Sequence, residues 1–105
     1  MLINLTPHDI TIIDGEDKRM IPKSGNVARL SVTRIAVAPT DGIYTASPML
    51  GETVGLPARE AGVFFLVSAL VAEANKDRND LRSPGELVRD SKGNPVGCLG
   101  LCQYA

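Results

Sequence analysis

The spacing of hydrophobic positions changes within residues 62–81, and this change predicts a strand followed by a helix. The first part of the segment is aromatic, β-branched or aliphatic, as in a buried strand. From Ser68 onward the composition shifts to Ala, Leu, Glu and Lys, which favour helix, and the Ser68 hydroxyl can cap the first turn. We therefore expect one principal helix over about residues 68–78, with Asn75 and Arg78 towards its far end.

Alternating or β-prone runs separated by Gly, Pro, Asn and Asp predict strands and turns for the rest of the chain. Short strands are expected at 3–5, 9–13, 18–21, 43–45, 87–90 and 95–101, and a long strand at 27–37 with a break near Thr33. The segment 47–57 is rich in Gly and Pro and is expected to be a mobile loop. We therefore predict an α+β fold, a mainly antiparallel β-sheet meander with one principal helix, in a single domain over residues 1–105.

Composition excludes several classes of function. Eleven basic residues against 12 acidic ones argue against a protein that binds DNA or RNA polymers by bulk charge. Cys98 and Cys102 lie about 13 Å apart if both are on one strand, which is too far for a disulfide and suits a reducing compartment. With one histidine, His8, a metal site is not expected. No apolar run approaches the roughly 20 residues that span a bilayer, so we expect a soluble cytoplasmic protein with no signal peptide.

Groups for catalysis are not assembled in any recognisable motif. His8 follows Pro7 in a turn, and we interpret it as fixing that turn rather than as a base, which would need a partner within hydrogen-bond reach. Ser68 is not part of a Gly-x-Ser-x-Gly motif, and the glycines form no phosphate-binding loop. We therefore expect no catalytic residues, no cofactor and no metal, and a binding protein rather than an enzyme.

Arginines are the candidate ligand groups, because a guanidinium offers planar, paired donors to phosphate or carboxylate. Arg29 lies in an otherwise apolar strand, where a charge needs a partner. Arg78 and Arg82 flank the exit of the expected helix, and Arg89 lies on a later strand. For two of these arginines a structural role stays open as an alternative to ligand binding. Arg89 can form an ion pair with a neighbouring aspartate, and Arg29 can reach solvent with its guanidinium along its aliphatic side chain.

Short motifs are spread over nearly the whole chain. They are Ile3-Asn4-Leu5-Thr6-Pro7-His8-Asp9-Ile10, Ile21-Pro22-x-Ser24-Gly25-x-Val27-Ala28-Arg29, Gly55-Leu56-Pro57, Leu66-Val67-Ser68-x-x-Val71-Ala72, Arg78-x-Asp80-Leu81-x-x-Pro84, Val88-Arg89-Asp90-x-x-Gly93 and Gly97-Cys98-x-Gly100-Leu101. The set resembles a group of short phage, prophage and bacterial proteins that open with Asn-Leu-Thr-Pro-His. The chain is also similar to the first-described type of Thoeris anti-defence protein, a viral sponge.

The resemblance implies a protein that binds cyclic ADP-ribose-type signals, made by bacterial TIR-domain enzymes, without cleaving them. Some members of that family also bind cyclic oligonucleotides, and members assemble from dimers, in some cases into hexamers, with ligand sites between subunits. The family's ligand groups are an aromatic, an Asn and arginines, which by position correspond to Phe65, Asn75, Arg78 and Arg89. Of Phe64 and Phe65, one is expected in the core and the other more exposed.

We therefore expect a viral or prophage anti-defence protein that sequesters a cyclic nucleotide signal in the host cytoplasm as a homo-oligomer. The expected ligand set is Arg29, Phe65, Asn75, Arg78 and Arg89. The alternative is a small protein-binding module or inhibitor of a host protein, which would use an exposed Phe and a sheet edge. A nucleotide hydrolase is a third hypothesis.

Overall fold

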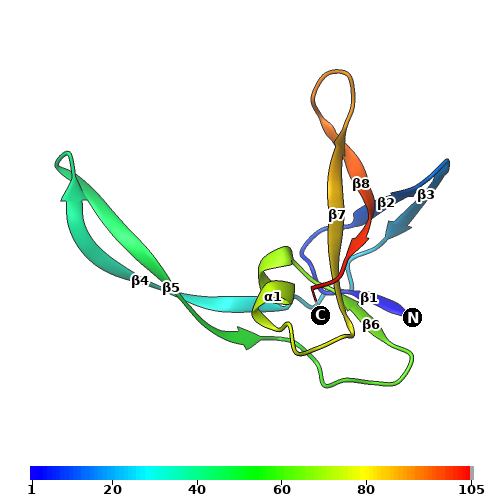
Figure 1. The fold of residues 1–105 in the computed structure, drawn as a ribbon, viewed down its shortest axis with the longest axis horizontal. Coiled ribbons are helices and arrows are strands. Elements are labelled where there is room, and N and C mark those ends of the chain that lie inside the picture. Colours follow the sequence, from blue (N-terminus) through cyan, green and yellow to red (C-terminus); the bar gives the residue numbers. More distant parts are fainter. Residues whose placement is uncertain (105) are drawn as a thin grey trace.

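The computed structural model describes residues 1–104, and its body is a curled, mixed β-sheet (Figure 1). The elements in chain order are β1 (Leu2–Asn4), β2 (Ile10–Asp14), β3 (Asp17–Ile21), β4 (Arg29–Thr40), β5 (Ile43–Val54), β6 (Phe64–Leu66), α1 (Ala69–Ala74), β7 (Leu81–Arg89) and β8 (Pro95–Cys102). Six strands form the body sheet in the order β1-β6-β7-β8-β2-β3. The other two, β4 and β5, pair only with each other, and we call this pair the ribbon.

The body sheet differs from the predicted antiparallel meander, because β6 pairs in parallel with both β1 and β7, and β2 pairs in parallel with β8. The hydrophobic strand β6 lies between two neighbours that come from distant parts of the chain. Phe65 is the partner of Ile3 on one side and of Leu81 on the other. A short, continuously apolar run of this kind is typical of a strand with parallel neighbours.

The α+β class with a principal helix at about 68–78 is wrong, because strands make up 56% of the structure and helix only 6%. Ser68 does cap α1, where its hydroxyl accepts a hydrogen bond from the Val71 amide. The helix ends six residues later because the Asn75 side chain donates to the Val71 carbonyl, which a continuing helix would need. The backbone amide of Asn75 instead donates to Ala72.

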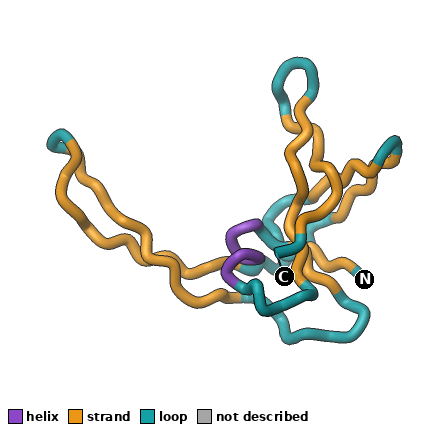
Figure 2. The backbone as a smooth tube through the Cα atoms, in the orientation of Figure 1, coloured by secondary structure: helices purple, strands orange, loops and turns teal. Residues whose placement is uncertain are grey.

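The ribbon replaces the mobile loop predicted for residues 47–57. There β5 continues to Val54 and pairs with β4 along its length, with a register shift between Leu30 and Val32, close to the break expected near Thr33. Figure 2 shows the ribbon extending away from the body. The radius of gyration, 16.5 Å, exceeds the roughly 13 Å of a compact domain of this size, as expected for projecting hairpins.

The hydrophobic core lies where α1 and the base of the ribbon pack against the body sheet. Its buried members are Leu5, Ala28, Leu30, Val63, Phe65, Val67, Val71, Ala72 and Leu81. Complete burial of a side chain such as Val67 stabilises the fold by about 1.5–3 kcal/mol. The core therefore holds β6, α1 and the start of β7 in fixed positions relative to one another.

The Asn-Leu-Thr-Pro-His motif forms a buried hydrogen-bond network around Asn4. The Asn4 amide donates to the carbonyl oxygens of His8 and Ile21, at 2.8 and 2.9 Å, and its oxygen accepts from the amide and hydroxyl of Thr6. His8 takes part through its backbone carbonyl, while the residue itself is exposed. This agrees with the interpretation of His8 as a turn residue.

Asn4→Ala is expected to lower the free energy of unfolding by roughly 2–4 kcal/mol, since it leaves several buried groups without partners. Urea denaturation measures the change. Asn26→Ala is the matched control, because Asn26 is exposed and bonds through its backbone; its effect is expected to stay within about 0.5 kcal/mol. Equal effects of the two substitutions would show that the Asn4 network does not stabilise the fold.

Candidate functional site

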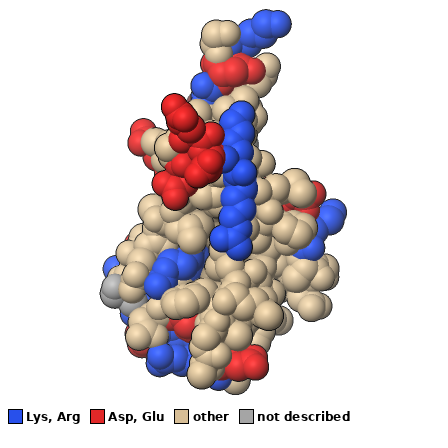
Figure 3. Space-filling model, turned by 90° about the vertical axis from the view of Figure 1, so that its right-hand side faces the viewer, with Lys and Arg blue, Asp and Glu red and all other residues tan. Residues whose placement is uncertain are grey.

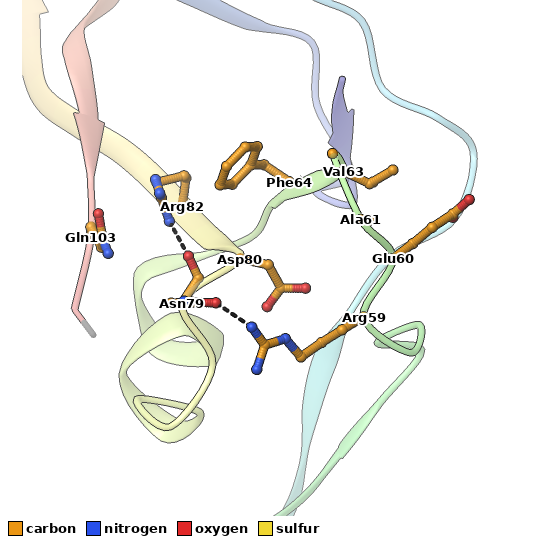
Figure 4. A pocket seen from close by; sticks show the side chains of 10 residues that line it. Arg59, Glu60, Ala61, Val63, Phe64, Asn79, Asp80, Arg82 and Gln103 are labelled. Carbon is orange, nitrogen blue, oxygen red and sulfur yellow. Dashed lines mark hydrogen bonds between the residues drawn. The ribbon is translucent and has the colours of Figure 1, made fainter.

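The candidate site is a cleft of about 450 Å³ beside the exposed face of β6 (Figure 4). It lies between the loop before β6, the chain entering β7 and the residue after β8. Its lining residues are Arg59, Glu60, Ala61, Gly62, Val63, Phe64, Asn79, Asp80, Arg82 and Gln103. We call it the Phe64 cleft. Its volume falls within the roughly 300–1,000 Å³ of small-molecule sites.

An exposed aromatic ring and a guanidinium form one wall of the cleft. Because side chains alternate along β6, Phe65 is buried with 3% of its surface exposed, whereas Phe64 is 40% exposed. The Arg82 guanidinium carbon lies 4.7 Å from the centroid of the Phe64 ring, within the range of a cation–π contact. The pair therefore offers an aromatic face and a positive charge at one position.

Asn79 orients the arginines on both sides of the cleft. Arg82 Nη1 donates to the carbonyl oxygens of Asn79 and Leu81, at 2.8 and 2.7 Å. Arg59 Nη2 donates to Asn79 Oδ1 at 2.5 Å, and Figure 4 shows both side chains directed towards Asn79. A guanidinium has five N–H donors, and within residues 1–104 the remaining donors of Arg59 and Arg82 have no protein partner.

The two acids of the cleft differ in their position relative to the arginines. Asp80 is buried and forms a two-pronged ion pair with Arg78, at 3.0 and 2.6 Å. Hydrogen bonding from Arg78 holds the pKa of Asp80 below its usual value, although burial acts in the opposite direction. Figure 4 shows the Glu60 side chain directed away from Arg82 and Phe64. Asp80 also interacts electrostatically with Arg59, so the negative charge of the cleft offsets Arg59 more than Arg82.

Three of the ligand residues predicted from the sequence lie near one another, but their side chains contact other residues of the protein. Phe65 is a core residue, and the Arg78 guanidinium lies 6.0 Å from its ring centroid. Arg78 also donates to the Pro57 carbonyl at 2.8 Å, besides its ion pair with Asp80. Asn75 caps the end of α1 and donates to the Thr53 hydroxyl at 2.8 Å. Their role in ligand binding stays a prediction.

The other two predicted ligand residues lie outside the lining of the Phe64 cleft. Arg29 is exposed at the start of β4, opposite Val54. Arg89 is exposed near the end of the β7–β8 hairpin, where its Nη1 donates to the Gly93 carbonyl at 2.8 Å. The structure therefore does not bring the five residues into one site within a single chain.

Sequence reasoning missed Arg59, Asn79 and Gln103, because no periodic or motif signal marks them. Arg82 was noted only for its position after the expected helix. Alternation along the strand separated Phe64 from Phe65 but did not show which ring lies in the core. That choice depends on the parallel neighbours of β6.

Charge elsewhere on the described surface is mixed. Figure 3 shows a group of acidic side chains beside a row of basic ones in its upper half, and scattered charged side chains of both signs among uncharged ones below. Asp14, Glu16 and Asp17 lie at the β2–β3 turn and are all exposed. Within residues 1–104, no cluster of His, Cys, Asp and Glu is arranged to hold a metal ion, and no helix is long and apolar enough to cross a bilayer.

Comparisons of the chain with protein-family models, with curated proteins and with solved structures gave no match.

Proposed function

We propose that the protein binds and sequesters a cyclic ADP-ribose-type or related cyclic nucleotide signal in the Phe64 cleft without cleaving it. The observation that supports this proposal best is the Phe64–Arg82 pair facing Arg59 across a cleft of about 450 Å³. The resemblance to the Thoeris anti-defence family supports a viral or prophage role against a host immune signal, acting in the host cytoplasm.

The chemistry of the cleft suits both parts of such a ligand. An adenine stacks on an exposed aromatic ring with a gain of about 1–3 kcal/mol per base. A pyrophosphate accepts charge-assisted hydrogen bonds from the free guanidinium donors of Arg82 and Arg59. Because Asn79 holds both arginines in place, little side-chain entropy is lost on binding.

The lining of the cleft favours retention of the ligand over its conversion. General acid–base catalysis needs a group that exchanges protons near neutral pH within hydrogen-bond reach of the substrate. Asp80 has a lowered pKa and is already paired with Arg78. Sequestration requires only tight binding and slow release, which the arginines and Phe64 can supply.

The test is to incubate the protein separately with cyclic ADP-ribose and with a cyclic oligonucleotide and to remove unbound nucleotide. The complex is then heat-denatured, and the mass of the released compound is measured by mass spectrometry. Intact nucleotide in amounts close to that of the protein is the expected result. Chemically altered nucleotide would identify an enzyme instead. No retained cyclic ADP-ribose or cyclic oligonucleotide at micromolar protein would favour the alternative, a protein-binding module, for which the exposed apolar ribbon is the supporting observation.

A further inference from the structure

The body sheet curls until its two edge strands, β1 and β3, approach each other. Asn4, at the end of β1, forms a β-bridge with Lys23, just after β3, and its carbonyl oxygen accepts a hydrogen bond from the Ser24 amide at 3.0 Å. Figure 1 shows both strands on the right-hand side of the body. Within residues 1–104 this is the only bridge between the two edges, so the rest of each edge strand stays unpaired on that side.

Two adjoining hollows lie on the surface between these edges. The smaller, of about 340 Å³, is lined by Met1, Leu2, Arg19, Phe64, Arg82 and Leu101. The larger, of about 490 Å³, shares Leu2, Arg19 and Leu101 with it and adds Ile12, Asp14, Asp17 and Ile21. Because the hollows have three lining residues in common, they form one continuous surface, which we call the Arg19 trough.

The inner end of the trough carries positive charge. Arg19 and Arg82 both line the smaller hollow, where Arg82 also lies against the Phe64 ring. The only ion pair in the described part of the chain joins Arg78 to Asp80, so neither Arg19 nor Arg82 is bound to a carboxylate. Two guanidinium groups at one place offer paired, charged donors to a carboxylate or a phosphate group.

The middle of the trough is aliphatic. Side chains alternate between faces along a strand, and directly paired residues share a face. Ile21 therefore lies on the same face as Arg19, and so does Ile12, the partner of Arg19 on β2. Leu2 from β1 and Leu101 from β8 complete this lining. A hydrocarbon chain that lies on these four side chains removes apolar surface from water, which is favourable.

The outer end of the trough is negative. Asp14 and Asp17 are directly paired beside the β2–β3 turn, and both are exposed. Asp17 is two residues from Arg19 along β3, a distance of roughly 7 Å. The order along the trough is therefore positive, apolar and negative. This order suits a chain with an anion at one end only, because a second anion would be repelled by the two aspartates.

We propose that the Arg19 trough binds a single-chain amphiphile, which is an aliphatic chain with one carboxylate or phosphate head group. The head group binds to Arg19 and Arg82 in the smaller hollow, and the chain lies on the four aliphatic side chains of the larger one. The proposal goes beyond nucleotide binding and rests on different residues, since Arg19 and these aliphatic side chains do not line the Phe64 cleft.

Isothermal titration calorimetry on the full chain tests the proposal with hexanoate, octanoate and decanoate and with the corresponding alkyl phosphates, all below the concentrations at which they form micelles. One molecule per chain is the expected result. Each added methylene group is expected to tighten binding about two- to fourfold, where fourfold corresponds to complete burial. The series that binds more tightly identifies the head group. Affinities independent of chain length in both series, or no binding of either ten-carbon compound, would overturn the proposal.

The orientation of the chain has its own test. Decanedioate carries a second carboxylate that would lie beside Asp14 and Asp17, so it is expected to bind about tenfold or more weakly than decanoate. Equal affinities of the two compounds would contradict the proposed orientation.

Two pairs of matched variants place the ligand in the trough. Arg19→Gln is expected to weaken binding of the ten-carbon compound about tenfold or more, because hydrogen bonds from a charged donor are lost. Lys18→Gln, an exposed position on the same strand that lines neither hollow, is expected to change it less than about twofold. Leu101→Ser is expected to weaken binding about fivefold. Leu99→Ser is the control on β8, because Leu99 is similarly exposed but lies outside the trough.

Equal weakening by Arg19→Gln and Lys18→Gln, with thermal unfolding unchanged, would indicate binding by general surface charge and would overturn the proposal. If a variant fails to fold, an NMR titration of the unchanged protein with decanoate decides. Amide signals of residues 18–21 and 99–102 are expected to shift, while those of residues 38–44 at the tip of the ribbon stay in place. Shifts confined to residues outside the trough would contradict the assignment.

Discussion

Replacing Phe64 and Arg82 together with Ala is expected to weaken binding of cyclic ADP-ribose by about 100-fold or more. Loss of base stacking costs about 1–3 kcal/mol, and loss of hydrogen bonds from a charged donor costs about 1.5–3 kcal/mol, where each 1.4 kcal/mol is a factor of ten. Neither side chain belongs to the hydrophobic core, so the fold is expected to persist. Isothermal titration calorimetry measures the affinity, and thermal unfolding checks the fold.

Arg89→Ala separates this cleft from the ligand set expected from sequence. Arg89 lies at the β7–β8 hairpin and does not line the cleft, so the variant is expected to bind like the unchanged protein. Loss of affinity in Arg89→Ala, with unchanged binding in the Phe64→Ala/Arg82→Ala variant, would place the site at the sequence-predicted residues instead.

The second large effect is on stability. Asp80→Ala is expected to lower the free energy of unfolding by about 3 kcal/mol at neutral pH, because it leaves the mostly buried Arg78 without its partner. The ion pair lies within the loop between α1 and β7, and its Arg78 guanidinium carbon is 6.0 Å from the ring centroid of the buried Phe65. Urea denaturation measures the loss. Glu73→Ala, which removes an exposed acid on α1, is the control and is expected to change stability by less than about 0.5 kcal/mol.

The effect of Asp80 depends on pH in a defined direction. Since Arg78 lowers the pKa of Asp80 in the folded protein, the pair contributes its full stability above the pKa of an unfolded aspartate, about 4. That contribution is lost as the pH falls through the lower pKa of the folded state. The stability difference between the unchanged protein and Asp80→Ala should therefore shrink below about pH 4. A difference that grows on acidification would contradict the ion-pair account.

Local features of the fold could be predicted from the sequence because their causes are local. The hairpin turn at Asp41 and Gly42 needs positive φ at both positions, as observed at 51° and 76°. The turns near Gly15 and Gly93 each place a glycine at positive φ, 63° and 84° respectively. The Ser68 cap was predicted correctly for the same reason.

The remaining features depend on partners far along the chain. The parallel pairing of β6 with β1 and β7 joins segments separated by many residues, and no periodicity encodes it. The helix was overestimated because the side chain of Asn75 ends it. The segment 47–54 was predicted to be a loop from its Gly and Pro content, but pairing with β4 overrides that composition. Similarly, β7 begins at Leu81 rather than at Leu87, because its first residues pair with β6.

Prediction of the candidate site is limited in the same way, because the site is formed by segments that are far apart in the sequence. The proposed cleft lies beside β6 and the chain that follows α1, the same segment in which the sequence analysis places Phe65 and Arg78. However, the cleft is completed by Arg59 from a loop and Gln103 from beyond β8, and only tertiary structure brings these residues to Phe64. Asn79 was overlooked because its role is to orient two arginines, which no spacing of residues reveals.

A crystal structure of the protein in complex with cyclic ADP-ribose tests the central claim most directly. The account predicts an intact nucleotide with its base on Phe64 and its pyrophosphate between the guanidinium groups of Arg82 and Arg59. Nucleotide bound at another place on the chain, or present as a cleaved product, would contradict it.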